Sequence, residues 1–161
     1  MSDIYLIGII YLFLTDKKIK KIIGDNMSAK DVLKLMKSKN IEFVDLRFTD
    51  PRGKLQHLTM DTTIVDEGML NDGVFFDGSS IAGWKAINES DMILKPDLSR
   101  KVIDPYTSHN TLILFCDILD AVKKDPYERD PRGIAKKAEA YLKKTGIGDT
   151  AYFGPEPEFF V

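Results

Sequence analysis

The sequence has little of what several classes of protein require. Its single cysteine, Cys116, excludes a disulfide framework within the 161 residues and fits a reducing, cytoplasmic setting. The two histidines, His57 and His109, are far apart and lack metal-ligand spacing, so we interpret both as structural or surface residues. The formal net charge of -2 gives no basic footprint, so no nucleic-acid partner is expected. What remains is an ordinary globular protein, in which Cys116 is predicted to be a core thiol.

Long hydrophobic runs are also missing, apart from one near the beginning of the chain. Residues 4–14 are hydrophobic throughout, but this run is too short to span a bilayer as a helix. Asp3 precedes the run and lysines follow it, which is the reverse of a secretory signal. We expect residues 1–26 to be an extra segment outside the working protein, which starts at Met27, and we expect no membrane association. A short membrane anchor is the alternative.

The middle of the chain predicts a small α+β domain. Ser28 is a good N-cap, with Asp31 three residues later, and Asn40 is a suitable end for the helix between them. A mixed sheet with this helix packed on it is the expected fold. Strands are predicted at 43–48, 55–60, 74–76, 90–96 and 111–118, with a type I turn at 50–53, an irregular stretch at 61–73 and the last strand central and buried.

A second unit is predicted after residue 122. Residues 123–129 are charged and contain a proline, which indicates a linker. Asp130 and Pro131 are typical of a helix start, and Gly146 is typical of a helix end. A strand is expected to begin at residues 149–154.

The most informative stretch is a polar loop that leads to the chain's one tryptophan. Residues 77–83 contain two glycines, two serines and an aspartate, so backbone and side-chain groups can point at a ligand. Trp84 follows directly. This arrangement fits a binding edge or, alternatively, a surface loop whose tryptophan packs into the core below. Composition alone favours the second interpretation.

Glu156 and Glu158 are the other candidate site. Side chains two apart on a strand share a face and lie roughly 6.5–7 Å apart along it. Such a pair suits Mg²⁺ or Mn²⁺, which prefer oxygen ligands. An exposed acidic strand edge is an equally good interpretation, because no histidine or further acidic cluster near by completes a metal site.

These motifs together resemble a known family. Asp-Gly-Ser-Ser-Ile-x-Gly-Trp-x-x-Ile-x-Glu-Ser-Asp-Met at 77–92 resembles the N-terminal domain of bacterial type I glutamine synthetases. The stretches 43–57, 127–132 and 154–160 resemble that family's N-terminal hairpin, the start of its catalytic domain and its first metal-binding strand. The resemblance extends over 27–161. It implies a β-grasp domain at 27–127, followed at 128–161 by the truncated start of the catalytic domain.

The resemblance also implies a reaction and roles. The family joins ammonia to glutamate at the expense of ATP, through a γ-glutamyl phosphate, in a double-hexameric ring of identical subunits with active sites between neighbours. Asp77 and Ser80 would form the ammonium site of the neighbouring subunit, with Asp91 in the same contact region. Trp84 would lie near the nucleotide entrance. Glu158 and Glu156 would bind the metal ions that hold glutamate and aid phosphoryl transfer.

The resemblance leaves alternatives open. The family's other metal ligands, its ATP site and its substrate-binding arginines would follow Val161, so we expect this chain to be inactive alone, as the product of a truncated gene or pseudogene. An alternative is a non-catalytic β-grasp module that can only co-assemble with an intact synthetase. A related γ-glutamyl-amine ligase is a further alternative, although the Asp77–Trp84 loop favours ammonia.

Overall fold

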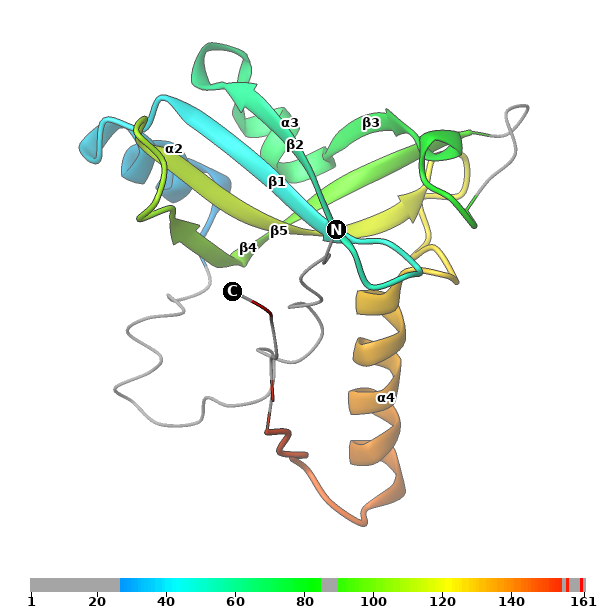
Figure 1. The fold of residues 1–161 in the computed structure, drawn as a ribbon. Helices are drawn as coiled ribbons and strands as arrows, with labels where there is room; N and C mark the ends of the chain where they lie inside the picture. The colour runs from blue at the N-terminus through cyan, green and yellow to red at the C-terminus, as the bar shows by residue number, and fades with distance from the viewer. Residues whose placement is uncertain (1–26, 85–89, 155, 157–159, 161) are drawn as a thin grey trace.

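The computed structural model describes residues 27–84, 90–154, 156 and 160, and the prediction for residues 1–26 lies outside them. The fold is α+β, with helices packed on one sheet and a last helix projecting from it (Figure 1). The helices are α2 (Ala29–Ser38), α3 (Glu67–Asp72) and α4 (Pro131–Thr145), with short 3-10 turns η2 (Thr62–Ile64) and η3 (Gly78–Ser80). The strands are β1 (Phe43–Thr49), β2 (Leu55–Asp61), β3 (Val74–Asp77), β4 (Asp91–Ile103) and β5 (Thr111–Asp120).

The sheet is mixed, and its central strand comes last in the sequence. The strand order is β2-β1-β5-β4-β3. β1 and β5 run parallel, with Phe43 opposite Thr111, whereas the other neighbours are antiparallel. The prediction that 111–118 forms the central, buried strand is therefore confirmed.

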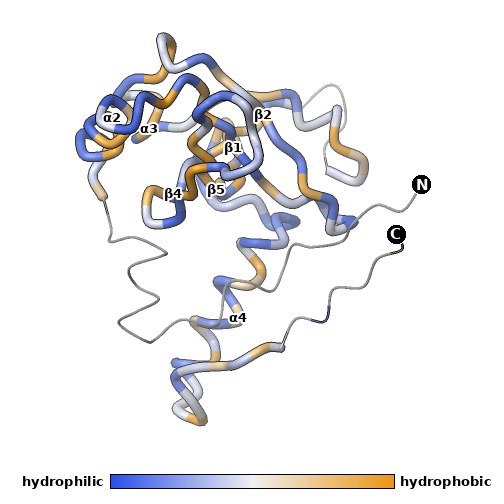
Figure 2. Tube along the Cα trace, turned by 60° about the vertical axis from the view of Figure 1, so that its left-hand side comes forward, coloured by the Kyte–Doolittle hydropathy of each residue, from blue (hydrophilic) through white to orange (hydrophobic). Residues whose placement is uncertain are grey.

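Alternation along the strands creates two different faces. Val44 and Leu46 of β1 and Leu112 and Leu114 of β5 are fully buried, and they pack with buried residues of α2 and α3. Figure 2 shows hydrophobic and hydrophilic residues alternating along the chain. Cys116 belongs to this core, where burial raises the pKa of its thiol, so the prediction of an inert core cysteine is confirmed.

The predicted helix start and hairpin turn are confirmed in detail. The Ser28 hydroxyl accepts a hydrogen bond from the Asp31 amide at 3.2 Å and donates to the Asp31 carboxylate at 2.7 Å. Asn40 follows the helix with a φ of 49°. In the hairpin, the Gly53 amide donates to the Asp50 carbonyl at 3.0 Å, as a turn at 50–53 requires.

Two predictions for the middle of the chain were wrong. Residues 61–73 are not irregular, because η2 and α3 lie there, and the Asp66 carboxylate caps α3 by accepting from the Met69 amide at 2.7 Å. α3 is too short to show a helical period in the sequence. β4 is much longer than 90–96, because a register shift after Pro96 accommodates the missing amide, and pairing resumes at Lys101.

The segment after β5 is attached rather than free. α4 begins after the N-cap Asp130 and ends at Gly146, whose φ is 70°, as predicted. The expected linker is held to the central strand, since the Tyr127 amide donates to the Ile118 carbonyl at 2.8 Å. Residues 149–154 do not form the expected strand. A strand needs a paired neighbour for its backbone groups, and none of the described strands pairs with them.

Candidate functional site

The polar loop begins at a glycine that no other residue could replace without movement. Gly78 follows β3, is buried, and donates its amide to the Ser90 carbonyl at 2.8 Å. A Cβ on Gly78 would lie 2.2 Å from the Met92 sulfur and 2.9 Å from the Ser90 carbonyl oxygen. The loop is therefore pressed against the start of β4, which fixes the position of the residue before it, Asp77.

Asp77 presents a charged group to solvent. One carboxylate oxygen accepts from the Ser79 hydroxyl at 2.6 Å and from the Ser79 amide at 2.8 Å. These hydrogen bonds, with weaker ones from Ser90 and Ser80, hold the pKa of Asp77 below its usual range. Asp77 and Ser80 are both exposed, so the loop offers a fixed negative charge beside a hydroxyl. Asp91 is also exposed and pairs with Asp77 across β3 and β4.

Trp84 ends this loop inside the core. Its side chain is 5% exposed. The indole stacks on Phe48 with a centroid distance of 5.7 Å, and the Phe76 and Tyr127 rings meet it edge-on at 6.0 and 5.9 Å. Its buried Nε1 has no hydrogen-bond partner among the residues that the structure describes. This geometry fits the packing interpretation, and the implied place of Trp84 near a nucleotide stays a prediction.

The second predicted site lies only partly within the described residues. Glu156 is exposed and lies outside any strand, and Glu158 is outside the described residues. Within residues 27–84 and 90–154 and at 156 and 160, no three acidic, histidine or cysteine side chains are placed to hold a metal ion. Residues 146–154 run below the sheet near the foot of α4, far from η3 at the end of β3 (Figure 1). The described residues alone therefore do not fit a metal centre.

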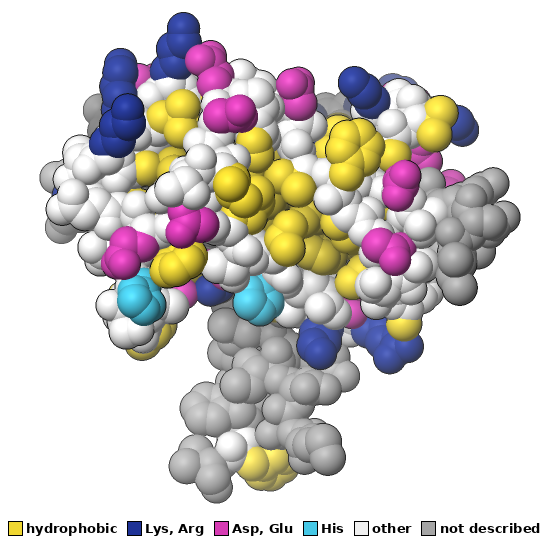
Figure 3. All heavy atoms as spheres, turned by 90° about the horizontal axis from the view of Figure 1, so that it is seen from above, with side chains coloured by type: hydrophobic (Ala, Val, Ile, Leu, Met, Phe, Trp, Pro, Cys, Tyr) yellow, Lys and Arg dark blue, Asp and Glu magenta, His cyan; other side chains and the backbone are white. Residues whose placement is uncertain are grey.

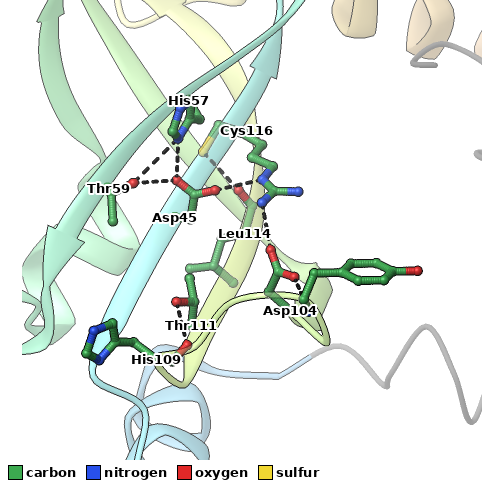
Figure 4. Close-up of polar contacts among 10 residues, drawn as sticks. Asp45, His57, Thr59, Asp104, His109, Thr111, Leu114 and Cys116 are labelled. Atoms are coloured by element: carbon green, nitrogen blue, oxygen red, sulfur yellow. Dashed lines mark hydrogen bonds and ion pairs between the residues drawn. The ribbon is translucent and has the colours of Figure 1, made fainter. Parts of the chain in front are cut away.

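Sequence reasoning missed a polar cluster on the sheet face opposite the helices. Asp45 is 4% exposed and accepts hydrogen bonds from Arg47 at 2.7 Å and Thr59 at 2.8 Å. His57 Nδ1 lies 2.9 Å from the same carboxylate, and Arg47 also pairs with Asp104 at 2.9 Å (Figure 4). Burial would raise the pKa of Asp45, but the hydrogen bonds lower it overall. His57 is an exposed residue that contacts this cluster, as the interpretation of it as a structural or surface residue allows, and alternation along β1 was the one sequence signal for the cluster.

A second charged cluster joins α4 to the same face. Arg132 forms ion pairs with Asp97 of β4 and with Asp117 of β5, the latter at 2.6 Å. Lys136 pairs with Asp117 at 2.6 Å as well. The first turns of α4 are thus tied to the sheet by charge, although no α4 residue is buried.

Comparisons with known proteins identify the family. The family described as "Glutamine synthetase, beta-Grasp domain" matches residues 40–121, and its catalytic domain matches residues 128–161. The chain is 63% identical over 134 residues to a glutamine synthetase of Rhizobium meliloti, an alignment that covers 83% of this chain and 29% of that protein. It is also 54% identical over 134 residues to a 3-hydroxylaminophenol mutase of Cupriavidus pinatubonensis, covering 83% of this chain and 28% of that protein.

A solved structure supports the same family. A cryo-EM structure of Plasmodium falciparum glutamine synthetase matches with a TM-score of 0.69 and 26% identity, covering 76% of this chain and 24% of that one. No helix among the described residues has the length and hydrophobicity needed to cross a membrane. The chain spans less than a third of the length of the curated relatives above. With its β-grasp sheet and the matches on both sides of residue 122, the chain belongs to the glutamine synthetase family.

Proposed function

We propose that this chain supplies the N-terminal part of a glutamate–ammonia ligase, which forms glutamine from glutamate, ammonia and ATP through a γ-glutamyl phosphate. Residues 27–127 would be its β-grasp domain and 128–161 the start of its catalytic domain. Family membership supports the reaction class, and the Asp77 loop supports the choice of ammonium as substrate.

The observation that carries the proposal is the exposed, charged carboxylate of Asp77 on a fixed loop. Ammonium is a small cation with four N–H donors, and a carboxylate binds it by charge and by hydrogen bonds. Ser79 occupies one carboxylate oxygen and lowers the pKa of Asp77, so the group stays ionised over the physiological range. Ser80 offers a hydroxyl oxygen as a further acceptor. A carboxylate of low pKa is a weak base, so Asp77 acts mainly by binding and orienting ammonium.

ATP and the metal ions belong to the same proposal. Mg²⁺ or Mn²⁺ would neutralise the phosphate charge, and Glu156 and Glu158 would contribute carboxylate oxygens to them. The described residues do not form that centre, so the part of the proposal for which the structure gives a geometry is the ammonium loop. Trp84 would support the wall beside the nucleotide from within the core.

The remaining partners follow from the ring assembly that the family resemblance implies. We propose a homo-oligomer, a double hexameric ring, in which Asp77 and Ser80 of one subunit complete the site of its neighbour, in the cytoplasm and without nucleic acid or membrane. A hydrophobic patch crosses the middle of one face of the molecule, with charged side chains around it (Figure 3). Such a patch suits burial against another subunit.

The relative named a mutase keeps a second function open. It is 54% identical to this chain over the same length as the first synthetase, so this stretch accompanies more than one named activity. A γ-glutamyl-amine ligase and a non-catalytic module that co-assembles with an intact synthetase also remain alternatives. An assay of the completed protein must therefore measure the reaction as well as binding.

The test is a chimaera in which the 134 aligned residues of this chain replace their counterpart in the Rhizobium meliloti glutamine synthetase. We expect ATP-dependent glutamine formation. Asp77→Asn keeps the shape but removes the charge, and it should lower kcat/KM for ammonium by about 10²-fold, the scale of one electrostatic contact in an active site.

Asp72→Asn is the matched control, because Asp72 is exposed on the neighbouring helix α3. It should leave kcat/KM for ammonium unchanged. An active chimaera in which Asp77→Asn behaves like Asp72→Asn would remove the ammonium role of this loop. A chimaera that assembles but forms no glutamine would favour the non-catalytic module.

A further inference from the structure

We propose that Arg129 and Tyr127 are positioning residues for the ammonium loop, which they hold from the segment that leads into α4. The inference rests on the proposed function, because it concerns the placement of Asp77 and Ser80. The Arg129 contact joins two parts of the chain that are matched by different domains of the family, 40–121 and 128–161, and Tyr127 lies between these two matches.

The first end of the loop is fixed by β4 alone. Gly78 bonds to the Ser90 carbonyl at 2.8 Å and packs against Met92 without room for a side chain. From there the chain turns tightly, since the Ile81 amide donates to the Gly78 carbonyl at 3.1 Å and the Trp84 amide donates to the Ile81 carbonyl at 3.2 Å. These bonds shape the loop, and Trp84 at its far end packs on Phe48 and Phe76 in the core.

The far end is also held by two residues of the segment that leads into α4. Arg129 Nη1 donates to the Gly83 carbonyl at 3.1 Å. Gly83 has a φ of 90°, so its carbonyl has a direction that other residues rarely adopt. Next to it, the Tyr127 ring meets the Trp84 indole edge-on at 5.9 Å. One hydrogen bond and one ring contact thus fix two successive residues at the end of the loop.

The segment that makes these contacts is itself firmly anchored. The Tyr127 amide donates to the Ile118 carbonyl at 2.8 Å, and the Ile118 amide donates back to the Asp130 carboxylate at 3.3 Å. Asp130 is 1% exposed and also caps α4 through the Arg132 amide at 3.1 Å. Residues 127–130 therefore connect the loop to the central strand β5. A movement of α4 would be passed to Asp77 through the same residues.

The experiment uses the same chimaera with Arg129→Ala. A misplacement of about 1 Å at a reacting group can cost about 10²-fold in rate, so kcat/KM for ammonium should fall by about that factor. The KM values for glutamate and ATP should change little. Arg129→Lys keeps a donor that can reach the Gly83 carbonyl and should recover a large part of the loss. Lys123→Ala is the control for charge, because Lys123 is an exposed cation of the same segment, and among the described residues only its amide is hydrogen-bonded, to Asp120.

A second measurement does not depend on activity. Trp84 is the single tryptophan of the sequence, so its fluorescence in the 161-residue chain reports on the end of the loop. Arg129→Ala should increase quenching of Trp84 by acrylamide and shift its emission to longer wavelength. Tyr127→Leu, which removes the edge-on ring but keeps an apolar side chain, should do the same, whereas Lys123→Ala should change neither.

The outcomes separate this inference from the proposed function. If Asp77→Asn lowers kcat/KM for ammonium as expected while Arg129→Ala leaves both kcat/KM for ammonium and Trp84 emission unchanged, the positioning role is wrong and the function stands. If Arg129→Ala raises the KM values for all three substrates equally, with no rescue by lysine, Arg129 is merely structural. If Asp77→Asn has no effect, the ammonium site itself has failed.

Discussion

At the scale of single residues, Gly78 gives the sharpest test of the structure. Gly78→Ala places a methyl group 2.2 Å from the Met92 sulfur and 2.9 Å from a backbone oxygen, so β3 and β4 must separate locally. We expect the free energy of unfolding to fall by about 1–3 kcal/mol, the usual cost of overpacking. Urea denaturation followed by circular dichroism measures it.

Gly148→Ala is the control for this substitution. A Cβ at Gly148 would make an ordinary 3.6 Å contact with the Leu142 side chain, and its φ is not in the left-handed region. Its free energy of unfolding should stay within about 0.5 kcal/mol of the parent. Equal stability of the two variants would contradict the close packing of β3 on β4.

The lowered pKa of Asp97 predicts a specific dependence of the free energy of unfolding on pH. Burial would raise the pKa of Asp97, but hydrogen bonds from Ser99 and the ion pair with Arg132 lower it from 3.8 to about 2. Because the folded pKa is below the unfolded one, the unfolded chain binds the proton first as the pH falls. Asp97 therefore stabilises the fold fully above about pH 4 and loses this contribution between about pH 4 and pH 2.

The variant Asp97→Asn removes the titrating group and tests this prediction. Its free energy of unfolding should be lower at pH 7, by an amount on the order of 2 kcal/mol, and should fall less between pH 5 and pH 2. Asp31→Asn, at an exposed ion pair on α2, should change the pH profile much less because solvent screens that pair. A parent and an Asp97→Asn variant with parallel pH profiles would refute the assignment.

How far the sequence predicted individual residues depended on the distance to their partners. The contacts of Asp77 with Ser79 and of Ser28 with Asp31 are local, so a turn or cap motif reveals them. Asp45 could not be recognised as buried, because two of its partners, His57 and Thr59, lie on β2 and reach it only through the strand register. The roles of Asp77, Ser80, Glu156 and Glu158 stay predictions.

At the scale of elements, the ends of α4 and the central strand were predicted correctly. The short helix α3 was missed, and the strand expected at 149–154 was wrong. Asp130 and Gly146 marked α4 correctly because capping is a property of the chain itself. α3 escaped notice since six residues hold less than two turns. The strand expected at 149–154 depends on a neighbour, which a sequence motif does not supply.

The helix α4 combines charged anchoring at its beginning with an uncovered hydrophobic face. Ile134 is 53% exposed and Tyr141 is 70% exposed, and the helix projects away from the sheet (Figure 2). The ion pairs of Arg132 and Lys136 lie within its first two turns, so nothing described holds its second half to the sheet. The second half of α4 should therefore open locally at lower cost than the strands do.

Limited proteolysis of the 161-residue chain tests this difference. Trypsin should cut first after Lys143 and Lys144, in the last turn of α4, and only later after Arg52 and Lys54. The residues that follow these four cleavage sites are exposed or half-exposed. The hairpin sites should be protected, however, because the amides of Arg52 and Lys54 donate to the Asp50 carboxylate at 2.9 Å each. Mass spectrometry of a time course identifies the order of the cuts. Early cleavage in the β1–β2 hairpin with an intact α4 would show that the second half of α4 does not open more easily than the sheet.

At the scale of the whole molecule, the family's sheet was predictable in class but its strand order was not. The mixed α+β character followed from one helix and several short strands. No local signal in the sequence pairs β1 with β5, since Phe43 and Thr111 meet only in the folded sheet. The assignment of residues 27–127 and 128–161 to separate domains also stays a prediction, and the hydrogen bonds of Arg129 with Gly83 and of Asp130 with Ile118 cross that boundary.

The position of β5 has a consequence for how the chain folds. The two antiparallel pairs, β1 with β2 and β3 with β4, form from neighbouring segments, but they touch in the sheet only through β5. During synthesis both pairs leave the ribosome before β5 does, each with an open edge. The insertion of Thr111–Asp120 then closes the sheet in one step, at the cost of closing a long loop. We therefore expect the sheet to be completed only after residues 111–120 arrive, with the slow pairing that non-local strands require.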